Sequence, residues 1–247
     1  MNGLLATFNR EMRAYFFSPL AYVILTFFLL INGYVFVLIV EYLNDPRVTG
    51  STTPLKLFFG DTLFFWLVML LITPVLTMRL ISEERRSGTI ESLMTAPVSE
   101  TQVVVGKFLG AFAFFTFLWL PTLVYVAIIA RHGEVDWGPV VCGYLGVLGI
   151  GAVFLSVGIF ASSFTKNQIV AAIITFAMLI FFFAIAFLDG LTNDEMRKNV
   201  LGHMNLIAHI DDFGKGILDT RRLVYYASTT ILFLFLTSNA LAAKKWR

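Results

Sequence analysis

The densest group of ionisable side chains lies in one segment, residues 79–107, which reads RLISEERRSGTIESLMTAPVSETQVVVGK. Its acids and bases are Arg79, Glu83, Glu84, Arg85, Arg86, Glu91, Glu100 and Lys107. No metal-ligand or nucleophile spacing accompanies these charges. Their chemistry is therefore that of ion pairing and of contact with another protein, and the elements that hold them decide which of the two applies.

The centre of this segment has the pattern of a short helix between two turns. Ser87-Gly88 interrupts the chain, and Thr89 can cap a helix that has Glu91 in its first turn, where a carboxylate suits the helix dipole. The apolar side chains on one face of this helix are Ile90, Leu93 and Met94, and the residue that ends it is Pro97. The pattern predicts an apolar knob with a charged rim, a shape suited to a groove in a partner protein. A solvated loop with a helix lying on the membrane remains the alternative.

Motifs for catalysis and for cofactor binding are missing from the sequence. Gly106-Lys107 is followed by Phe108, and Thr101 stands where a P-loop requires Gly. No HExxH occurs, and Phe154 replaces the first Gly of GxSxG around Ser156. The histidines, His132, His203 and His209, have no metal-ligand spacing, and the single cysteine is Cys142. We expect a non-catalytic chain that binds no cofactor or metal itself.

The overall composition places most of the chain in lipid. Hydrophobic residues make up 58% of the 247 residues and charged residues 14%, whereas soluble domains have about 25% charged residues. So little charge cannot cover a water-exposed surface, which excludes a soluble enzyme, a nucleic-acid binder and a disordered chain. The net charge of +2 is too small to indicate a polyanionic partner.

Six apolar stretches have the length of about 20 residues that a membrane-spanning helix needs. They are residues 20–40, 62–81, 108–130, 139–164, 169–188 and 224–243. The fold class predicted is an all-α polytopic membrane protein, with residues 1–247 forming one transmembrane domain. Apart from Arg79 near the end of the second stretch, no Asp, Glu, Lys, Arg or His lies inside these stretches, which argues against a proton-driven carrier.

An even number of spans puts both termini on one side of the membrane. When the long loop 189–223 is set aside, Lys and Arg are distributed ten to three in favour of the side that holds the termini. The positive-inside rule then predicts that both termini are cytoplasmic.

Three segments outside the apolar cores also carry patterns. Residues 1–19 are expected to form an amphipathic helix on the inner membrane surface, because its apolar side chains share one arc: Leu4, Leu5, Phe8, Met12, Tyr15 and Phe16. A frayed tail is the alternative. Ser99 and Gln102 form a capping box, so the third span is expected to begin near Glu100. Short helices in the loop 189–223 are expected to cover the outer mouth, as a lid or as a cap.

Glycines occur at spacings that allow helices to approach closely. Gly106 and Gly110 lie four residues apart at the start of the third span. The fourth span carries a small-residue surface made of Gly143, Gly146, Gly149, Gly151, Gly158 and Ser162.

The run from Ile81 to Val98, followed by Gly106-Lys107, resembles the inner loop of ABC-2 type transporter permeases, in which it follows the second span as it does here. Residues 165–168 and 213–221 are similar to the gliding-motility-type branch of the bacterial permeases. The resemblance covers the whole chain.

This resemblance implies a function and a set of partners. The chain would be the permease subunit of an ATP-driven exporter in the bacterial inner membrane, dimerising with a second permease. Separate ABC ATPase subunits would bind ATP and Mg²⁺, and a membrane-anchored accessory protein with a large outer domain would join them. The segment 89–96 would be the coupling helix, flanked by Glu83, Glu84, Arg85, Arg86 and Gly88. A non-transporting mechanical role is the first alternative, and an ATP-independent channel or carrier is the second.

Overall fold

The computed structural model describes residues 3–45, 57–89, 98–133, 135–191 and 201–245. In these residues the secondary structure is helical, without strands, and six helices are long and apolar enough to cross a membrane. The predicted all-α polytopic fold is confirmed. How the chain divides into domains stays a prediction.

The six candidate spans start and end close to the predicted residues. The first is α2 (Pro19–Asn44), and the second combines α4 (Leu63–Thr77) with α5 (Ser82–Arg86). The third is α7 (Glu100–Trp119), continued through the 3₁₀ turn η2 (Leu120–Thr122) into α8 (Leu123–His132). The last three spans are α9 (Trp137–Ser162), α10 (Gln168–Leu191) and α13 (Thr220–Lys245).

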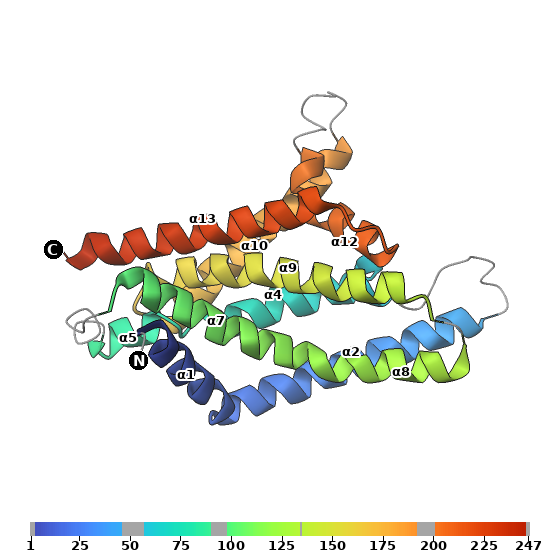
Figure 1. The fold of residues 1–247 in the computed structure, drawn as a ribbon, viewed down its shortest axis with the longest axis horizontal. Coiled ribbons are helices and arrows are strands. Elements are labelled where there is room, and N and C mark those ends of the chain that lie inside the picture. Colours follow the sequence, from blue (N-terminus) through green and yellow to red (C-terminus); the bar gives the residue numbers. More distant parts are fainter. Residues whose placement is uncertain (1–2, 46–56, 90–97, 134, 192–200, 246–247) are drawn as a thin grey trace.

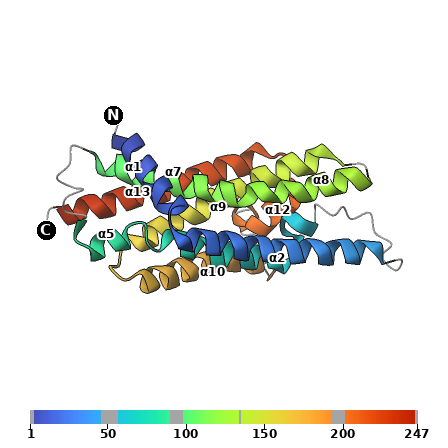
Figure 2. The same cartoon turned by 90° about the horizontal axis from the view of Figure 1, so that it is seen from below.

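The helices form an elongated bundle whose two termini lie at the same end (Figure 1). We call this the termini end, and the opposite end the distal end. α1 and α5 lie at the termini end, and the loop that joins α8 to α9 lies at the distal end, as the second view also shows (Figure 2).

α9 is the centre of the bundle and packs against α4, α7, α10, α12 and α13. Its glycines receive side chains from the surrounding helices, which confirms the expected small-residue surface. A β-carbon at Gly151 would lie 2.2 Å from Cε1 of Phe115 on α7, and one at Gly149 would lie 2.4 Å from Cδ2 of Tyr226 on α13. Only glycine at these positions lets the aromatic rings approach so closely.

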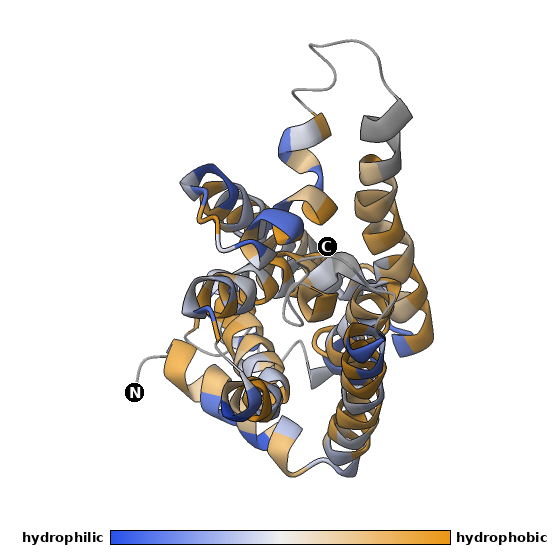
Figure 3. Ribbon diagram, turned by 90° about the vertical axis from the view of Figure 1, so that its right-hand side faces the viewer, coloured by the Kyte–Doolittle hydropathy of each residue, from blue (hydrophilic) through white to orange (hydrophobic). Residues whose placement is uncertain are grey.

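The outer helices turn large apolar side chains outward. Phe27 and Leu30 on α2, Phe181 on α10 and Ile231 on α13 are each more than half exposed. Figure 3 shows hydrophobic colour along most of the helices, with hydrophilic colour in short stretches. Such a surface is unfavourable in water and suits contact with lipid.

The N-terminal helix α1 (Gly3–Phe16) forms where it was predicted and docks on α7 through a face that shares Tyr15 with its apolar arc. Its place on the membrane surface stays a prediction. Its buried residues are Thr7, Glu11 and Tyr15, whereas Leu5 is half exposed. β-carbons at Gly106 and Gly110 would lie 2.8 and 2.7 Å from side-chain atoms of Thr7 and Glu11. The two glycines of α7 therefore let α1 approach closely, and they decide which of its faces is buried.

Two short elements pack together at the distal end. They are the π-helical turn η1 (Leu57–Asp61) and α12 (Leu206–Gly214), which confirms a short helix before the last span. Gly60 has a φ of +130°, and a β-carbon there would lie 2.3 Å from Cγ2 of Ile210. Leu206, His209, Ile210 and Phe213 are buried, so α12 is part of the core.

Candidate functional site

The predicted contact segment begins at α5, which continues the second span at the termini end. Glu83, Glu84, Arg85 and Arg86 form this helix, and Gly88 follows in the left-handed conformation with a φ of +72°. Thr89 has helical geometry and is the last described residue before the gap. The rest of the predicted coupling helix lies outside the described residues, namely Ile90, Glu91, Leu93, Met94 and Pro97.

Glu84 joins a cluster of four charged side chains drawn from three helices. Lys107 of α7 places its Nζ 2.9 Å from Oε1 of Glu84 and 2.8 Å from Oε1 of Glu11 on α1. Arg10 donates to Glu84 and lies 3.1 Å from Oε1 of Glu11. Two carboxylates therefore face two cations, and the cluster ties α5 to both α1 and α7.

Three of the four side chains of the cluster are largely withdrawn from solvent, while Arg10 is 49% exposed. The side chain of Lys107 is 2% exposed, that of Glu11 10% and that of Glu84 14%. Desolvation of an unpaired charge costs several kcal/mol, so each of these groups depends on its partners. The arrangement of three helices is thereby restricted to positions in which Lys107 reaches both carboxylates.

The charges of the cluster also affect Arg10. Burial opposes its protonated form, but the nearby Glu84 and Glu11 carboxylates outweigh burial and raise the pKa of the guanidinium. Arg10 therefore stays charged.

Tyr15 makes a second link between α1 and the second span. Its hydroxyl donates to the backbone carbonyl of Leu76 at 2.8 Å, and the guanidinium of Arg79 lies 4.6 Å from its ring centroid. Burial raises the pKa of Tyr15, against the charge of Arg79, so the hydroxyl remains protonated and a donor.

The other side of α5 contacts the loop between α9 and α10. Gln168 Nε2 donates to Oε2 of Glu83 at 2.6 Å, and Arg85 donates to the backbone carbonyl of Ser163. The hydroxyl of Ser162 accepts from the backbone N–H groups of Ile81 and Ser82 at 3.2 and 3.1 Å. The start of α5 is therefore capped by a side chain from α9.

α5 is thus bonded to four neighbours: α1, α7, the end of α9 and the start of α10. Beyond it, Arg86, Ser87, Gly88 and Thr89 are exposed. A turn that is open to solvent is therefore attached directly to a helix held by charged and polar contacts to most of the termini end.

The helix that follows the contact segment starts as predicted. Ser99 caps α7 by accepting from Gln102 N at 3.3 Å, and the Gln102 side chain accepts from Ser99 N at 3.3 Å. A β-carbon at Gly3 would lie 2.8 Å from Cγ1 of Val98. α1 therefore begins beside the point where the segment re-enters the described chain.

Sequence reasoning located α5 but missed most of its partners. Glu11 has an available signal, since Thr7, Glu11 and Tyr15 recur at helical spacing and Glu11 is the acid among basic neighbours. Lys107 follows Gly106 directly, one residue before the apolar core of the third span. Nothing in the sequence indicates the contacts of Ser162, Ser163 or Gln168, because loop packing sets them.

In the described part of the chain, no group of three or more His, Cys, Asp or Glu is placed to hold a metal ion. What the site provides is a mechanical connection between an exposed turn and several spans.

Comparison with known proteins places the whole chain in one family. The family model described as ABC-2 family transporter protein matches residues 8–245, and no curated protein matches the chain. The matched range includes α5, its charged cluster and all six candidate spans. The chain therefore belongs to the ABC-2 transporter family and is a multi-pass membrane permease subunit.

Proposed function

We propose that this permease subunit couples ATP hydrolysis by separate ABC ATPase subunits to the export of a substrate. The observation that carries the proposal is the bonding of α5 to α1, α7, α9 and α10 next to an exposed turn. In this proposal the ATPase contacts residues 86–97, with Leu93 and Met94 as the apolar anchor.

The physical basis is the cost of moving α5 alone. A displacement of α5 alone would separate Glu84 from both Lys107 on α7 and Arg10 on α1 and leave a largely buried carboxylate unpaired, so α1 and α7 must move with α5. On the opposite side, the bonds to Ser162, Ser163 and Gln168 couple the same displacement to α9 and α10. A push on the turn is thereby shared among several spans.

The proposal includes the partners implied by the family. Two ATPase subunits bind ATP and Mg²⁺, and a second permease, identical or related, completes the pathway. Both termini are cytoplasmic in this arrangement, and the complex resides in a bacterial inner membrane. The proposal also includes membership of the gliding-motility-type branch and a membrane-anchored accessory protein with a large outer domain as a further partner.

The test is to introduce a charge into the proposed anchor in the full complex. Leu93→Asp and Met94→Asp are expected to insert normally but to lose ATPase copurification and stimulated ATP turnover, because a carboxylate cannot be buried in an apolar groove. Asn167→Asp is the matched control, since it adds the same charge in the other loop at the termini end and keeps an oxygen for Ile169 N. Full turnover and copurification in both anchor variants would contradict the docking assignment.

Charge swaps at Glu83 and Arg86 test the coupling step separately. Glu83→Lys and Arg86→Glu are expected to reduce ATP-driven activity more than protein level, since both side chains are exposed. Equal losses of level and activity would contradict this.

Reconstituted complex distinguishes export from the alternatives. Vectorial movement of a candidate substrate that depends on ATP supports export. ATP turnover without transport supports the mechanical role, and flux through the permease without an ATPase supports a channel or carrier.

A further inference from the structure

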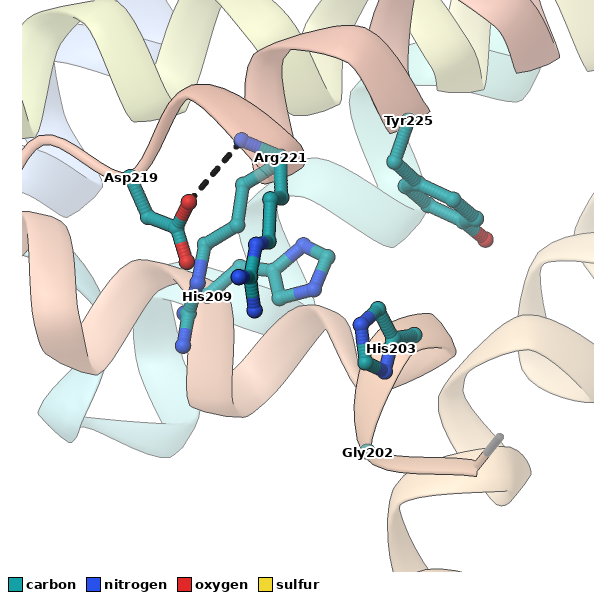
Figure 4. A pocket seen from close by; sticks show the side chains of 7 residues that line it. Gly202, His203, His209, Asp219, Arg221 and Tyr225 are labelled. Carbon is teal, nitrogen blue, oxygen red and sulfur yellow. Dashed lines mark hydrogen bonds between the residues drawn. The ribbon is translucent and has the colours of Figure 1, made fainter. Parts of the chain in front are cut away.

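A polar pocket of about 260 Å³ opens at the distal end, where α13 begins. It lies between α12, the residues before it and the first turns of α13. Figure 4 shows the side chains gathered around one space. The lining residues are Gly202, His203, His209, Asp219, Arg221, Arg222 and Tyr225. The position is where a polar loop meets a membrane-spanning helix, and it is distant from α5 (Figure 1).

The two arginines of the pocket differ in their surroundings. Arg222 donates to the backbone carbonyl of Ala208 and to the carboxylate of Asp212, both on α12, so its guanidinium is held in place. The Arg221 side chain is exposed and makes no hydrogen bond or ion pair with the described residues. One guanidinium is therefore committed to the fold, and the other is available for a ligand.

The acid in the lining is already engaged. Asp219 Oδ1 accepts from the backbone N–H of Arg221 at 2.9 Å, which caps the start of α13. The Asp219 carbonyl accepts from the N–H of Arg222 at 3.1 Å. The backbone N–H groups of Arg221 and Arg222 are thus occupied, so the side chains of the lining are the groups considered for recognition in this pocket.

His209 on α12 is a buried histidine with one ring nitrogen that lacks a hydrogen-bond partner. It is 2% exposed, and its Nδ1 has no hydrogen-bond partner. Its ring packs edge-on against Tyr225 and Tyr226, with each centroid pair 5.5 Å apart. Buried polar groups in native proteins are normally paired, and the low pKa of this histidine keeps its ring neutral, so the unpaired nitrogen calls for a hydrogen-bonding group, such as a water molecule or the hydroxyl of a protonated phosphate.

We propose that this pocket binds a phosphate group, carried by a lipid headgroup or free in solution, with Arg221 as the principal contact. The guanidinium fork matches phosphate oxygens in a bidentate geometry and is exposed to approach. The volume also exceeds the roughly 30 Å³ that one water molecule occupies, so a phosphate-sized group has room.

A metal ion is the less suitable occupant. The described residues around the pocket do not form a set of three or more His, Cys, Asp or Glu that would ligate one. The proposal does not depend on ATPase coupling, so either can fail without the other.

The experiment measures binding to the purified full chain in a phosphate-free sugar detergent, by the shift of its thermal unfolding midpoint. The ligands are short-chain phosphatidylglycerol, a short-chain diacylglycerol glucoside without phosphate, and sodium phosphate. The variants are Arg221→Gln and Arg221→Lys. Arg131→Gln is the matched control, because Arg131 is an exposed arginine at the same end of the bundle, on α8.

We expect phosphatidylglycerol to stabilise the wild type and the control, and the glucoside not to. Arg221→Gln should weaken the apparent affinity at least about tenfold. The affinity of Arg221→Lys should lie between those of the wild type and Arg221→Gln, because Lys keeps the charge but lacks the planar guanidinium fork. If sodium phosphate binds with the same affinity as phosphatidylglycerol, free phosphate is identified as the occupant. If sodium phosphate binds more weakly than phosphatidylglycerol, the lipid headgroup is identified as the occupant.

Two results would overturn the proposal. One is equal stabilisation by the glucoside and phosphatidylglycerol, which would show that the acyl chains alone are bound. The other is wild-type affinity of Arg221→Gln for both phosphate-bearing ligands.

Discussion

The two ends of the bundle are held together by different interactions. At the termini end, buried charges join α1, α5 and α7 through Lys107 and its two carboxylate partners. At the distal end, aromatic and aliphatic side chains pack against the glycines of α9. Phe59 packs against Gly143, and Ile210 packs against Gly146. The ion-pair cluster at the termini end is directional and more deeply buried than the distal pair of Arg222 with Asp212, whereas these glycine contacts at the distal end depend on shape.

This difference bears on how each end responds to a force. Packed apolar surfaces resist change because interiors are dense, but they accept a sliding movement that keeps their contacts. A buried charge pair resists separation more strongly, since each partner alone is costly in a low-dielectric environment. We infer that the termini end moves as a unit, as a coupling function requires, while the distal end can rearrange by sliding.

The largest expected effect is at Lys107. Lys107→Met keeps the length of the side chain but leaves Glu11 and Glu84 with Arg10, whose side chain is 49% exposed, as the remaining cation of the cluster. The free energy of unfolding should fall by about 3–5 kcal/mol, measured by denaturant unfolding of the purified chain. Arg13→Gln, an exposed arginine of α1, is the control and should change little. Wild-type stability of Lys107→Met would show that the cluster does not hold the termini end together.

The second expected effect is a pH dependence at the distal end. Burial, with the charge of Arg222 adding to it, lowers the pKa of His209 from 6.5 to about 4. As the pH falls below 6.5 the unfolded chain binds a proton before the folded chain does, so stability present above pH 6.5 is lost toward pH 4. The shift corresponds to about 3 kcal/mol at most.

His209→Gln should therefore flatten the unfolding free energy against pH between 6.5 and 4. His132→Gln, which alters an exposed histidine of α8, should leave the profile of the wild type unchanged. Identical profiles for wild type and His209→Gln would mean that this imidazole does not contribute to the pH dependence.

The third expected effect tests close packing on α9. The added methyl group of Gly149→Ala would lie 2.4 Å from Cδ2 of Tyr226, so the ring or the helix must shift. The loss of unfolding free energy should be about 1–3 kcal/mol. Gly133→Ala is the control, because a β-carbon there meets no atom within 4 Å. If both variants were equally stable, close packing would not be what holds the distal end.

The smallest expected effect concerns the cap of α7. Ser99→Ala removes the acceptor of the Gln102 N–H and should cost about 1 kcal/mol in denaturant unfolding. Ser99→Asp keeps an oxygen at the cap and should restore most of the loss. An alanine variant as stable as the aspartate variant would mean that the capping box adds nothing to the helix start.

Much of the fold follows from one-dimensional patterns. Continuous apolar stretches locate the spans to within a few residues, because lipid leaves no alternative to hydrogen-bonded helices. The start of α7 at Glu100 follows from Ser99 and Gln102, since a capping box is a local arrangement of four residues. The glycine spacing of α9 likewise indicates close packing before any partner is known.

The site was predictable only in part. Charge density identifies α5 from Glu83 to Arg86, but the apolar arc of α1 does not indicate that Thr7 and Glu11 contact α7. Hydropathy describes how a helix meets lipid and says nothing about the groove that Gly106 and Gly110 open on α7. His209 was interpreted as an ordinary loop histidine, yet it is buried in α12.

By itself the sequence determined the membrane-spanning architecture, the position of the charged segment and the lack of known catalytic motifs, because each depends on residues close together in the chain. The tertiary structure alone decided that Lys107 meets Glu11, a residue 96 positions away. It also decided that Arg221 and His209 line one pocket. The physical reason is that a buried polar contact requires two side chains to meet in space, and only the packing of the helices determines which ones do.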